Sequence, residues 1–272
     1  MKSILWIIGI PVIVIVGFFM FNSYIYNEKQ EDTSMQPTQN PVQVIPISHA
    51  TAVLVWPAST SDSSTRGGGD VVIYTDPIGG AEAFAGQPAP TIILVTDIHG
   101  DHLSTSTLAA VIKENTALIV PQAVKDMLPE DLAARAKVLA NDEFTAEQEL
   151  KIQAVPMYNL PDADNKDRHV KGRGNGYIIA GVDFRVYVAG DTAGTPEMRA
   201  LTDIDIALVP MNLPYTMGVE EAADAVLAFK PRQVYPYHYR GPDGLADVGT
   251  FKQLVNAGDP NIEVILAEWY PQ

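Results

Sequence analysis

Four side chains that bind cations lie within residues 96–102, whose sequence is TDIHGDH: Asp97, His99, Asp101 and His102. They directly follow the apolar run IILV at residues 92–95, which is typical of a buried strand. A solvated turn would carry one or two such groups, whereas imidazole and carboxylate donors gathered together are how proteins hold divalent metal ions. The spacing therefore predicts part of a metal site at the end of a strand.

Two other apolar strands also end in a potential ligand. Asp191 lies in VYVAGDT at residues 186–192, and His238 lies in QVYPYHY at residues 233–239. Because a rigid sheet fixes the geometry of its loops, α/β enzymes assemble their sites at strand ends, and we expect these three to meet. The chain has no cysteine, so His, Asp and Glu are the only strong ligands that it offers.

Length and charge limit the possible partners. The chain has 272 residues, of which 47% are hydrophobic, enough for one large core or at most two small domains. Its formal net charge is -15, and such a surface repels phosphate backbones. We therefore expect no nucleic acid and a small-molecule substrate, while the sequence leaves the oligomeric state open.

The N-terminal residues predict a membrane anchor. The run from Ile4 to Phe21 carries no charge and would span about 27 Å as a helix, close to the thickness of the hydrocarbon core. A cleaved signal peptide is the alternative, but no pair of small residues suited to cleavage follows the run. Lys2 favours a cytoplasmic N-terminus, which places the rest of a single-pass protein on the extracytoplasmic side. We assign 1–26 to the anchor, 27–41 to a flexible linker and 42–272 to the folded domain.

The order of elements predicts layered sheets with helices outside. Strands are expected first, at 42–47, 52–56 and 71–75, with a Ser/Thr/Gly loop at 57–70. Helices are then expected at 106–115, 123–136 (with a possible interruption at Pro129), 219–229 and 251–257. Between them we expect strands at 117–120, 138–140, 152–157, 177–180, 184–189, 206–210, 234–237 and 262–267.

These motifs resemble a known family. Residues 97–102 are similar to the HxHxDH signature of the metallo-β-lactamase superfamily, with Asp97 in place of the first His, while AGDT at 189–192 and His238 match its later ligands. YTDP at 74–77 and the segment 221–239 resemble the branch of ascorbate-6-phosphate lactonase-like and N-acyl-phosphatidylethanolamine phospholipase D-like proteins. The resemblance implies a four-layered αββα sandwich, here preceded by one transmembrane helix, and covers roughly residues 45–268.

The resemblance also implies a metal-dependent hydrolase with two divalent metal ions, zinc or manganese, with iron possible. The first ion would be held by Asp97, His99 and His169, the second by Asp101, His102 and His238, and Asp191 would bridge them. A hydroxide shared by the ions would attack an ester, lactone, amide or phosphodiester bond. Asp101 would also orient it, and Tyr215 is a candidate donor to the developing oxyanion. A non-catalytic binding protein of the same fold is the alternative.

Several assignments stay open. Asn159 and His169 compete for the third ligand of the first ion, and donor strength favours His169. Asp97 is either a ligand, which would harden the site and favour manganese, iron or magnesium over zinc, or a cap of the following helix. His49 is expected to be structural or to support a ligand, and Asp76 to belong to a turn near the site.

Overall fold

The computed structural model describes residues 42–57 and 69–271. The predicted anchor at 1–26 and linker at 27–41 lie outside these residues. Within the described ranges, no helix is both long and apolar enough to cross a bilayer.

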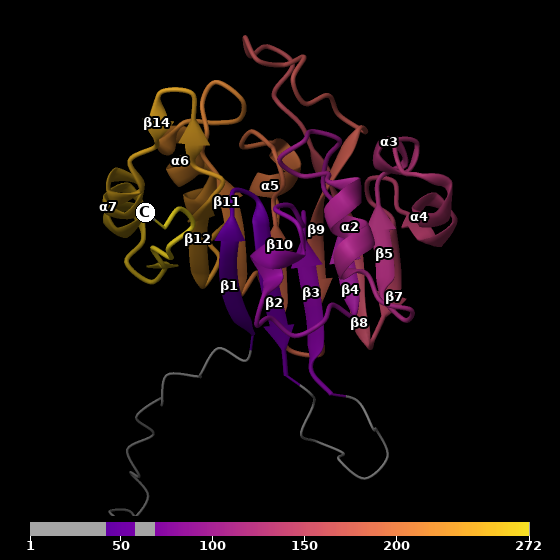
Figure 1. Cartoon of the computed structure of the whole chain (residues 1–272). Helices are drawn as coiled ribbons and strands as arrows, with labels where there is room; N and C mark the ends of the chain where they lie inside the picture. Colours follow the sequence, from indigo (N-terminus) through magenta and orange to yellow (C-terminus); the bar gives the residue numbers. More distant parts are fainter. Residues whose placement is uncertain (1–41, 58–68, 272) are drawn as a thin grey trace, which may run out of the picture. The chain divides into compact units, whose positions relative to one another are not determined.

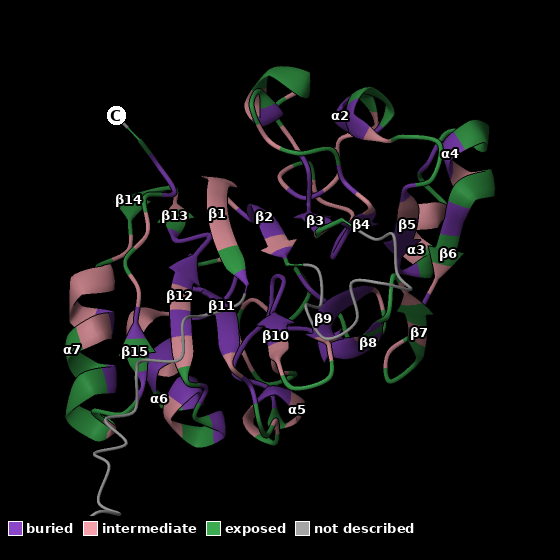
Figure 2. Cartoon of the chain, turned by 90° about the horizontal axis from the view of Figure 1, so that it is seen from below, coloured by how far each residue is buried: buried purple, intermediate pink, exposed green. Residues whose placement is uncertain are grey.

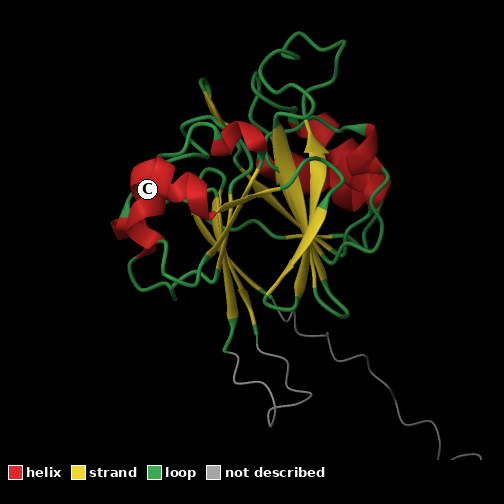
Figure 3. Ribbon diagram, turned by 90° about the vertical axis from the view of Figure 1, so that its right-hand side faces the viewer, coloured by secondary structure: helices red, strands yellow, loops and turns green. Residues whose placement is uncertain are grey.

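Two large sheets face each other, with helices on their outer sides (Figure 3). The first sheet has six strands in chain order: β1 (Gln43–Ser48), β2 (Thr51–Trp56), β3 (Val71–Thr75), β4 (Ile92–Leu94), β5 (Ala117–Val120) and β6 (Ala136–Val138). β1, β2 and β3 are antiparallel neighbours, whereas β3 to β6 run parallel. Parallel strands need helical crossovers, and these are η2 (Ala81–Phe84), α2 (Thr105–Val111), α3 (Gln122–Lys125) and α4 (Glu130–Arg135).

The second sheet has seven strands in the order β15-β12-β11-β10-β9-β8-β7. Its strands are β7 (Phe144–Glu147), β8 (Leu150–Met157), β9 (Gly174–Ala180), β10 (Arg185–Val188), β11 (Ile206–Pro210), β12 (Gln233–Tyr237) and β15 (Glu263–Val264). β7 to β10 are antiparallel neighbours, and β10, β11, β12 and β15 run parallel. The helices α5 (Pro196–Arg199), α6 (Val219–Phe229) and α7 (Val248–Gly258) connect them, and a small hairpin of β13 (Arg240–Gly241) and β14 (Gly244–Leu245) follows β12 (Figure 1).

Alternating side chains divide the first sheet between two cores. Ile92 and Leu94 point into the core shared with the second sheet, whereas Ile93 and Val95 pack with Leu108 of α2. Successive side chains of a strand point to opposite faces, so an all-apolar strand such as β4 is buried on both. Figure 2 shows the same pattern as buried strands with exposed residues on the outer sides of the helices.

The predicted elements are largely present, with local corrections. The helix expected at 123–136 is two short helices, since α3 ends at Lys125 and α4 begins after Pro129, which is its N-cap. The strand expected at 138–140 lies at Ala136–Val138, and that expected at 262–267 is only Glu263–Val264. β7 and α5 were not predicted. β7 is an edge strand without buried residues, and α5 is a single turn, so neither carries a hydrophobic pattern.

Candidate metal centre

The predicted strand ends meet at one edge of the two sheets. Residues 96–102 follow β4, Asp191 follows β10 and His238 follows β12, while His169 comes from the loop between β8 and β9. Asp97, His102, His169, Asp191 and His238 are all at most 3% exposed. The side chains of His99 and Asp101 are 40% and 44% exposed. All seven predicted ligands therefore come together, five of them buried and two at the surface of the site.

The first of two clusters contains Asp97, His99 and His169, whose ligand atoms all lie within 4.8 Å of one another. His99 Nδ1 is 2.8 Å and His169 Nε2 is 3.8 Å from the same oxygen, Oδ2 of Asp97. One carboxylate oxygen and two ring nitrogens thus converge as the ligands of a single ion would.

The second cluster contains Asp101, His102 and His238, within the same limit. His238 Nε2 is 3.2 Å from Asp101 Oδ2 and 3.2 Å from His102 Nε2. Two imidazole nitrogens in contact are unfavourable if both carry protons, and both are suited to one shared cation.

Asp191 lies between the two clusters. Its Oδ2 is 3.1 Å from His169 Nε2 and 3.3 Å from His102 Nε2, and its Oδ1 is 3.4 Å from His238 Nε2. A single carboxylate therefore contacts both clusters, which is the position of a bridging ligand.

The buried atoms of the site fit a metal. Nδ1 and Nε2 of His169 and Oδ1 of Asp191 are buried without a hydrogen-bond partner. Buried polar atoms are rarely left unpaired in folded proteins, and here Nε2 and the carboxylate face each other across the centre. Nitrogen and carboxylate donors suit zinc, manganese and iron. The donor set thus accommodates divalent ions, while the role of each residue as a ligand stays a prediction.

The carboxylates of the centre are held in their ionised form. Burial would raise the pKa of Asp191, but His238 and His102 beside it hold this pKa well below its usual range. The pKa of Asp101 is likewise lowered in spite of burial, chiefly by its hydrogen bond to His238. Metal ligands must be deprotonated to bind, so both carboxylates are ready to do so at neutral pH.

Comparisons with known proteins agree with this geometry. A profile of the beta-lactamase superfamily domain matches residues 62–238. A protein of Thermococcus onnurineus, named a UPF0173 metal-dependent hydrolase, is 34% identical over 204 residues, which are 71% of this chain and 88% of that protein. The chain belongs to this family of metallo-β-lactamase superfamily hydrolases.

Solved structures support the same assignment. A protein of Parabacteroides distasonis, described by analogy as a metal-dependent hydrolase, superposes with a TM-score of 0.69 at 35% identity, covering 84% of this chain and 94% of that one. Igni18, described as a metallo hydrolase of Ignicoccus hospitalis, superposes with a TM-score of 0.64 at 21% identity, covering 83% of this chain and 94% of its own, and shows the shared fold alone. The chain is thus a metal-dependent hydrolase with a mixed α/β metallo-β-lactamase fold.

In this hydrolase Asp76 contacts the predicted ligand His102, a contact that we did not predict from the sequence, although the bend at Asp76 does lie near the site as expected. Asp76 follows β3, is fully buried, and its Oδ2 lies 2.9 Å from His102 Nδ1. Thr96 donates its backbone N–H to Oδ1 and its hydroxyl to Oδ2, both at 2.7 Å. A carboxylate at Nδ1 fixes the proton there and leaves Nε2 free for a metal. The sequence offered one indication of this contact: Asp76 directly follows β3, and β3 runs parallel to β4, so the ends of both strands lie side by side.

Asn212 and His49 support His238 of the hydrolase from two sides. Asn212 Nδ2 lies 3.4 Å from His238 Nδ1, and the hydroxyl of Thr216 donates to the other amide atom, Oδ1. The ring of His49 meets that of His238 edge-on, with centroids 5.7 Å apart. His49 is in neither cluster, as expected, whereas Asn212 was not singled out from the sequence.

The structure shows the contacts of Asn159 and Asp97, the two residues whose roles the sequence left open. Asn159 donates its Nδ2 to the backbone oxygens of Tyr215, at 2.8 Å, and Asn165, at 2.9 Å. Asn159 thereby joins two loops, while His169 Nε2 faces Asp191. Because Asn159 Oδ1 is also buried without a hydrogen-bond partner, His169 as the ligand stays a prediction. Asp97 does not cap the following helix, because Ser104 is the N-cap of α2 and accepts from the backbone N–H of Thr107.

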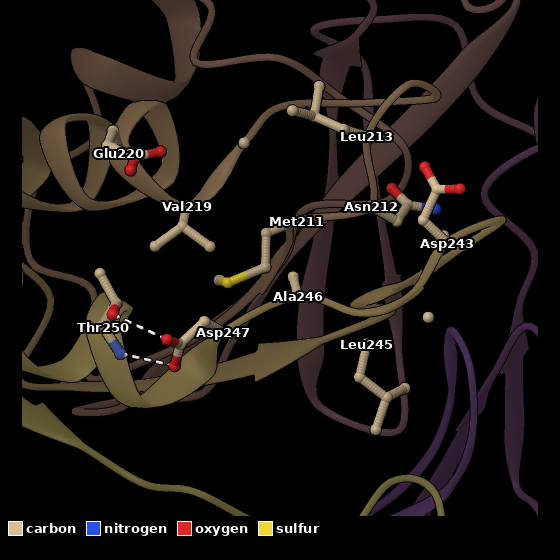
Figure 4. A pocket seen from close by; sticks show the side chains of 13 residues that line it. Met211, Asn212, Leu213, Val219, Glu220, Asp243, Leu245, Ala246, Asp247 and Thr250 are labelled. Carbon is tan, nitrogen blue, oxygen red and sulfur yellow. Dashed lines mark hydrogen bonds between the residues drawn. The ribbon is translucent and has the colours of Figure 1, made fainter.

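A cavity of about 410 Å³ opens over the metal centre of the hydrolase. Its walls include ligands from both clusters together with Tyr215 and Arg168, whose guanidinium lies 4.8 Å from the centre of the Tyr215 ring. A second cavity of about 430 Å³ lies on the other side of Asn212, which lines both. Figure 4 shows apolar side chains in its middle and the half-exposed Leu213 and Leu245 on opposite sides.

Proposed function

We propose that this protein is a membrane-anchored, two-metal hydrolase that cleaves an ester, lactone, amide or phosphodiester bond of a small molecule. The observation that carries the proposal is the position of Asp191, whose two oxygens contact ligand atoms of both clusters. A site for one ion needs no carboxylate shared in this way.

The residues divide between the two ions by cluster. Asp97, His99 and His169 would hold one ion, Asp101, His102 and His238 the other, and Asp191 both. When bound, divalent ions such as zinc, manganese or iron polarise the scissile group and make an activated water available near neutral pH. No amino-acid nucleophile is then required.

Two further residues have roles in the reaction. Asp101 lines the cavity with one oxygen 3.2 Å from His238 Nε2 and the other 3.9 Å from His102 Nε2, so it orients the attacking water through its carboxylate. Tyr215 lines the same cavity and supplies a hydroxyl to the oxyanion that develops on the substrate. Asn159 holds the backbone of Tyr215 and thereby fixes this loop.

The cavity favours a substrate with an anionic group. Arg168 lines it, and because this side chain is exposed and stacked on Tyr215, its charge is available to a ligand, whereas Arg173 in the same lining is paired with Asp97. YTDP at 74–77 and the segment 221–239 lead us to place the chain near the lactonase-like and phospholipase D-like branch, whose named substrates carry a phosphate. The acidic net charge of -15 disfavours a nucleic acid.

The membrane anchor is the second part of the proposal. The uncharged run from Ile4 to Phe21 supports a single transmembrane helix, and Lys2 supports an extracytoplasmic catalytic domain. Such an anchor would confine turnover to substrates that reach the outer side of the membrane.

The test is metal content together with turnover. Full-length protein stripped of metal and reloaded with Zn²⁺ or Mn²⁺ should bind two ions per chain and hydrolyse bis(p-nitrophenyl) phosphate or a simple lactone. Asp191→Asn should lower both the stoichiometry and the rate. Binding of one ion contradicts the two-metal site, and two bound ions without turnover of any substrate class would support the non-catalytic alternative.

A further inference from the structure

A buried ion pair joins Asp97 to the residue that precedes β9. Arg173 donates Nε to Oδ1 of Asp97 at 3.2 Å and Nη2 to Oδ2 at 3.0 Å. Asp97 is fully buried and the side chain of Arg173 is 19% exposed. Such two-pronged guanidinium–carboxylate pairs fix orientation as well as charge.

The backbone next to Arg173 lies close to Asp97 and to the residue before it. A side chain at Gly174 would meet Thr96 O at 2.8 Å and Asp97 Oδ1 at 3.3 Å. The backbone N–H of Asn175 donates to Thr96 O at 2.9 Å, and Arg173 Nη2 also donates to Arg168 O at 2.5 Å. The start of β9 therefore lies directly against the Asp97 strand end, and the guanidinium has one defined position.

Arg173 contacts both oxygens of Asp97, and one of them, Oδ2, faces the first cluster. Oδ2 of Asp97 accepts from Arg173 Nη2 and is the oxygen approached by the ring nitrogens of His99 and His169. Asp97 stands where the signature that it resembles has a histidine, and a carboxylate there adds one negative charge. The charge of Arg173 cancels that addition, because the pair together is neutral, as an uncharged imidazole is.

We propose that Arg173 is a positioning residue of the metal centre, which neutralises Asp97 and presents its Oδ2 to the first ion, so that the pair replaces a histidine ligand. The proposal rests on the proposed function, since it requires an ion at Asp97, His99 and His169. The sequence alone led us to expect that the negative charge of Asp97 favours manganese, iron or magnesium over zinc. Because Arg173 neutralises that charge, this preference should be small while Arg173 is present.

The Asp97–Arg173 pair predicts that restoring the histidine of the family signature at residue 97 weakens metal binding. Asp97→His restores the commoner signature but leaves Arg173 as an unpaired buried cation beside a divalent ion. Metal binding to the first cluster should therefore weaken, by about tenfold or more, as expected for an uncompensated charge in a buried site. Removing that cation as well, in Asp97→His/Arg173→Gln, should regain at least tenfold of the affinity.

The experiment measures metal affinity and stoichiometry in full-length protein, with Mn²⁺ and Zn²⁺ in competition with a fluorescent chelator. It compares wild type, Asp97→His, Arg173→Gln and the double variant, and melting temperatures without metal report folding. Asp97→Asn with and without Arg173→Gln repeats the cycle with a side chain of unchanged size, should Asp97→His not fold. Arg173→Lys keeps the charge without the two-pronged contact, and should fall between wild type and Arg173→Gln.

Arg135→Gln is the matched control, because Arg135 donates to backbone oxygens outside the site and not to a carboxylate. It should leave metal affinity unchanged. If the double variant binds no more tightly than Asp97→His while wild type holds two ions, Arg173 is not coupled to Asp97 and the inference is wrong, although the proposed function stands. If wild type binds no metal, both are overturned.

Discussion

Asp76→Asn should weaken metal binding by reversing the tautomer of His102. In the protein, Asp76 Oδ1 accepts the backbone N–H of Thr96 at 2.7 Å, and Oδ2 faces His102 Nδ1 at 2.9 Å. The His102 Nδ1 therefore keeps a proton, and Nε2, which lies 3.3 Å from Asp191 Oδ2, is the nitrogen that would bind an ion. The substitution would preserve the shape of the side chain and change only what its two terminal atoms can donate or accept.

The size of the effect follows from the same contacts. The oxygen of the new amide must stay at Thr96 N–H, so its NH₂ faces His102 Nδ1 and donates to it. The ring proton then moves to Nε2, where it blocks the metal. Metal binding requires the amide to flip, which leaves the buried Thr96 N–H unpaired at a cost of about 1–3 kcal/mol. That corresponds to a loss of about 5- to 150-fold in affinity.

The assay is a metal titration of full-length Asp76→Asn against wild type, followed by the metal bound per chain. Affinity should fall in the second cluster, which contains His102, while the first cluster keeps its ion. Asp183→Asn, at an exposed Asp between β9 and β10, is the matched control and should titrate as wild type.

One result would refute the reasoning. If Asp76→Asn binds two ions with wild-type affinity and retains the wild-type melting temperature, the Asp76 carboxylate does not set the state of His102. A general loss of folding would show in the melting temperature, which separates collapse of the site from a change of tautomer.

Four further outcomes are expected. His238→Ala should lower bound metal to about half, measured by elemental analysis, because it removes the nitrogen that contacts Asp101 and Asp191; unchanged stoichiometry would contradict its role. His169→Ala should strip metal more than Asn159→Ala, which should mainly lower the melting temperature by freeing two loops, and the reverse order would make Asn159 the ligand. Arg168→Gln should raise KM for a phosphodiester but not for an uncharged lactone, and equal effects on both would remove the anionic-group assignment. Full-length protein should stay with membranes after carbonate extraction, whereas a mature N-terminus just after residues 1–26 would show a cleaved signal.

Much of the metal centre could be read from the sequence because its information is local. Residues 96–102 follow β4, and Asp191 and His238 follow β10 and β12, so all the predicted ligands except His169 come soon after an apolar run. The ends of β10 and β12 lie at one edge of the second sheet, and the end of β4 reaches them because the first sheet packs face to face with the second. The position of His169 was harder to predict, because a residue in a loop has no periodic pattern that shows which way its side chain points. Only the fold of the loop directs His169 toward the centre and the amide nitrogen of Asn159 toward Tyr215.

The supporting contacts were decided by tertiary structure alone. Asp76 is 26 residues from His102, Asn212 is 26 from His238, and Arg173 is 76 from Asp97. Each pair joins separate strands or loops, and its geometry depends on strand register and on close approaches such as that at Gly174. The residue types at a strand end indicate that a metal can bind there. The net charge of the site and the tautomers of its histidines are set by side chains from distant parts of the sequence. These contacts have large effects because the site is buried, where neighbouring charges and hydrogen bonds are strong.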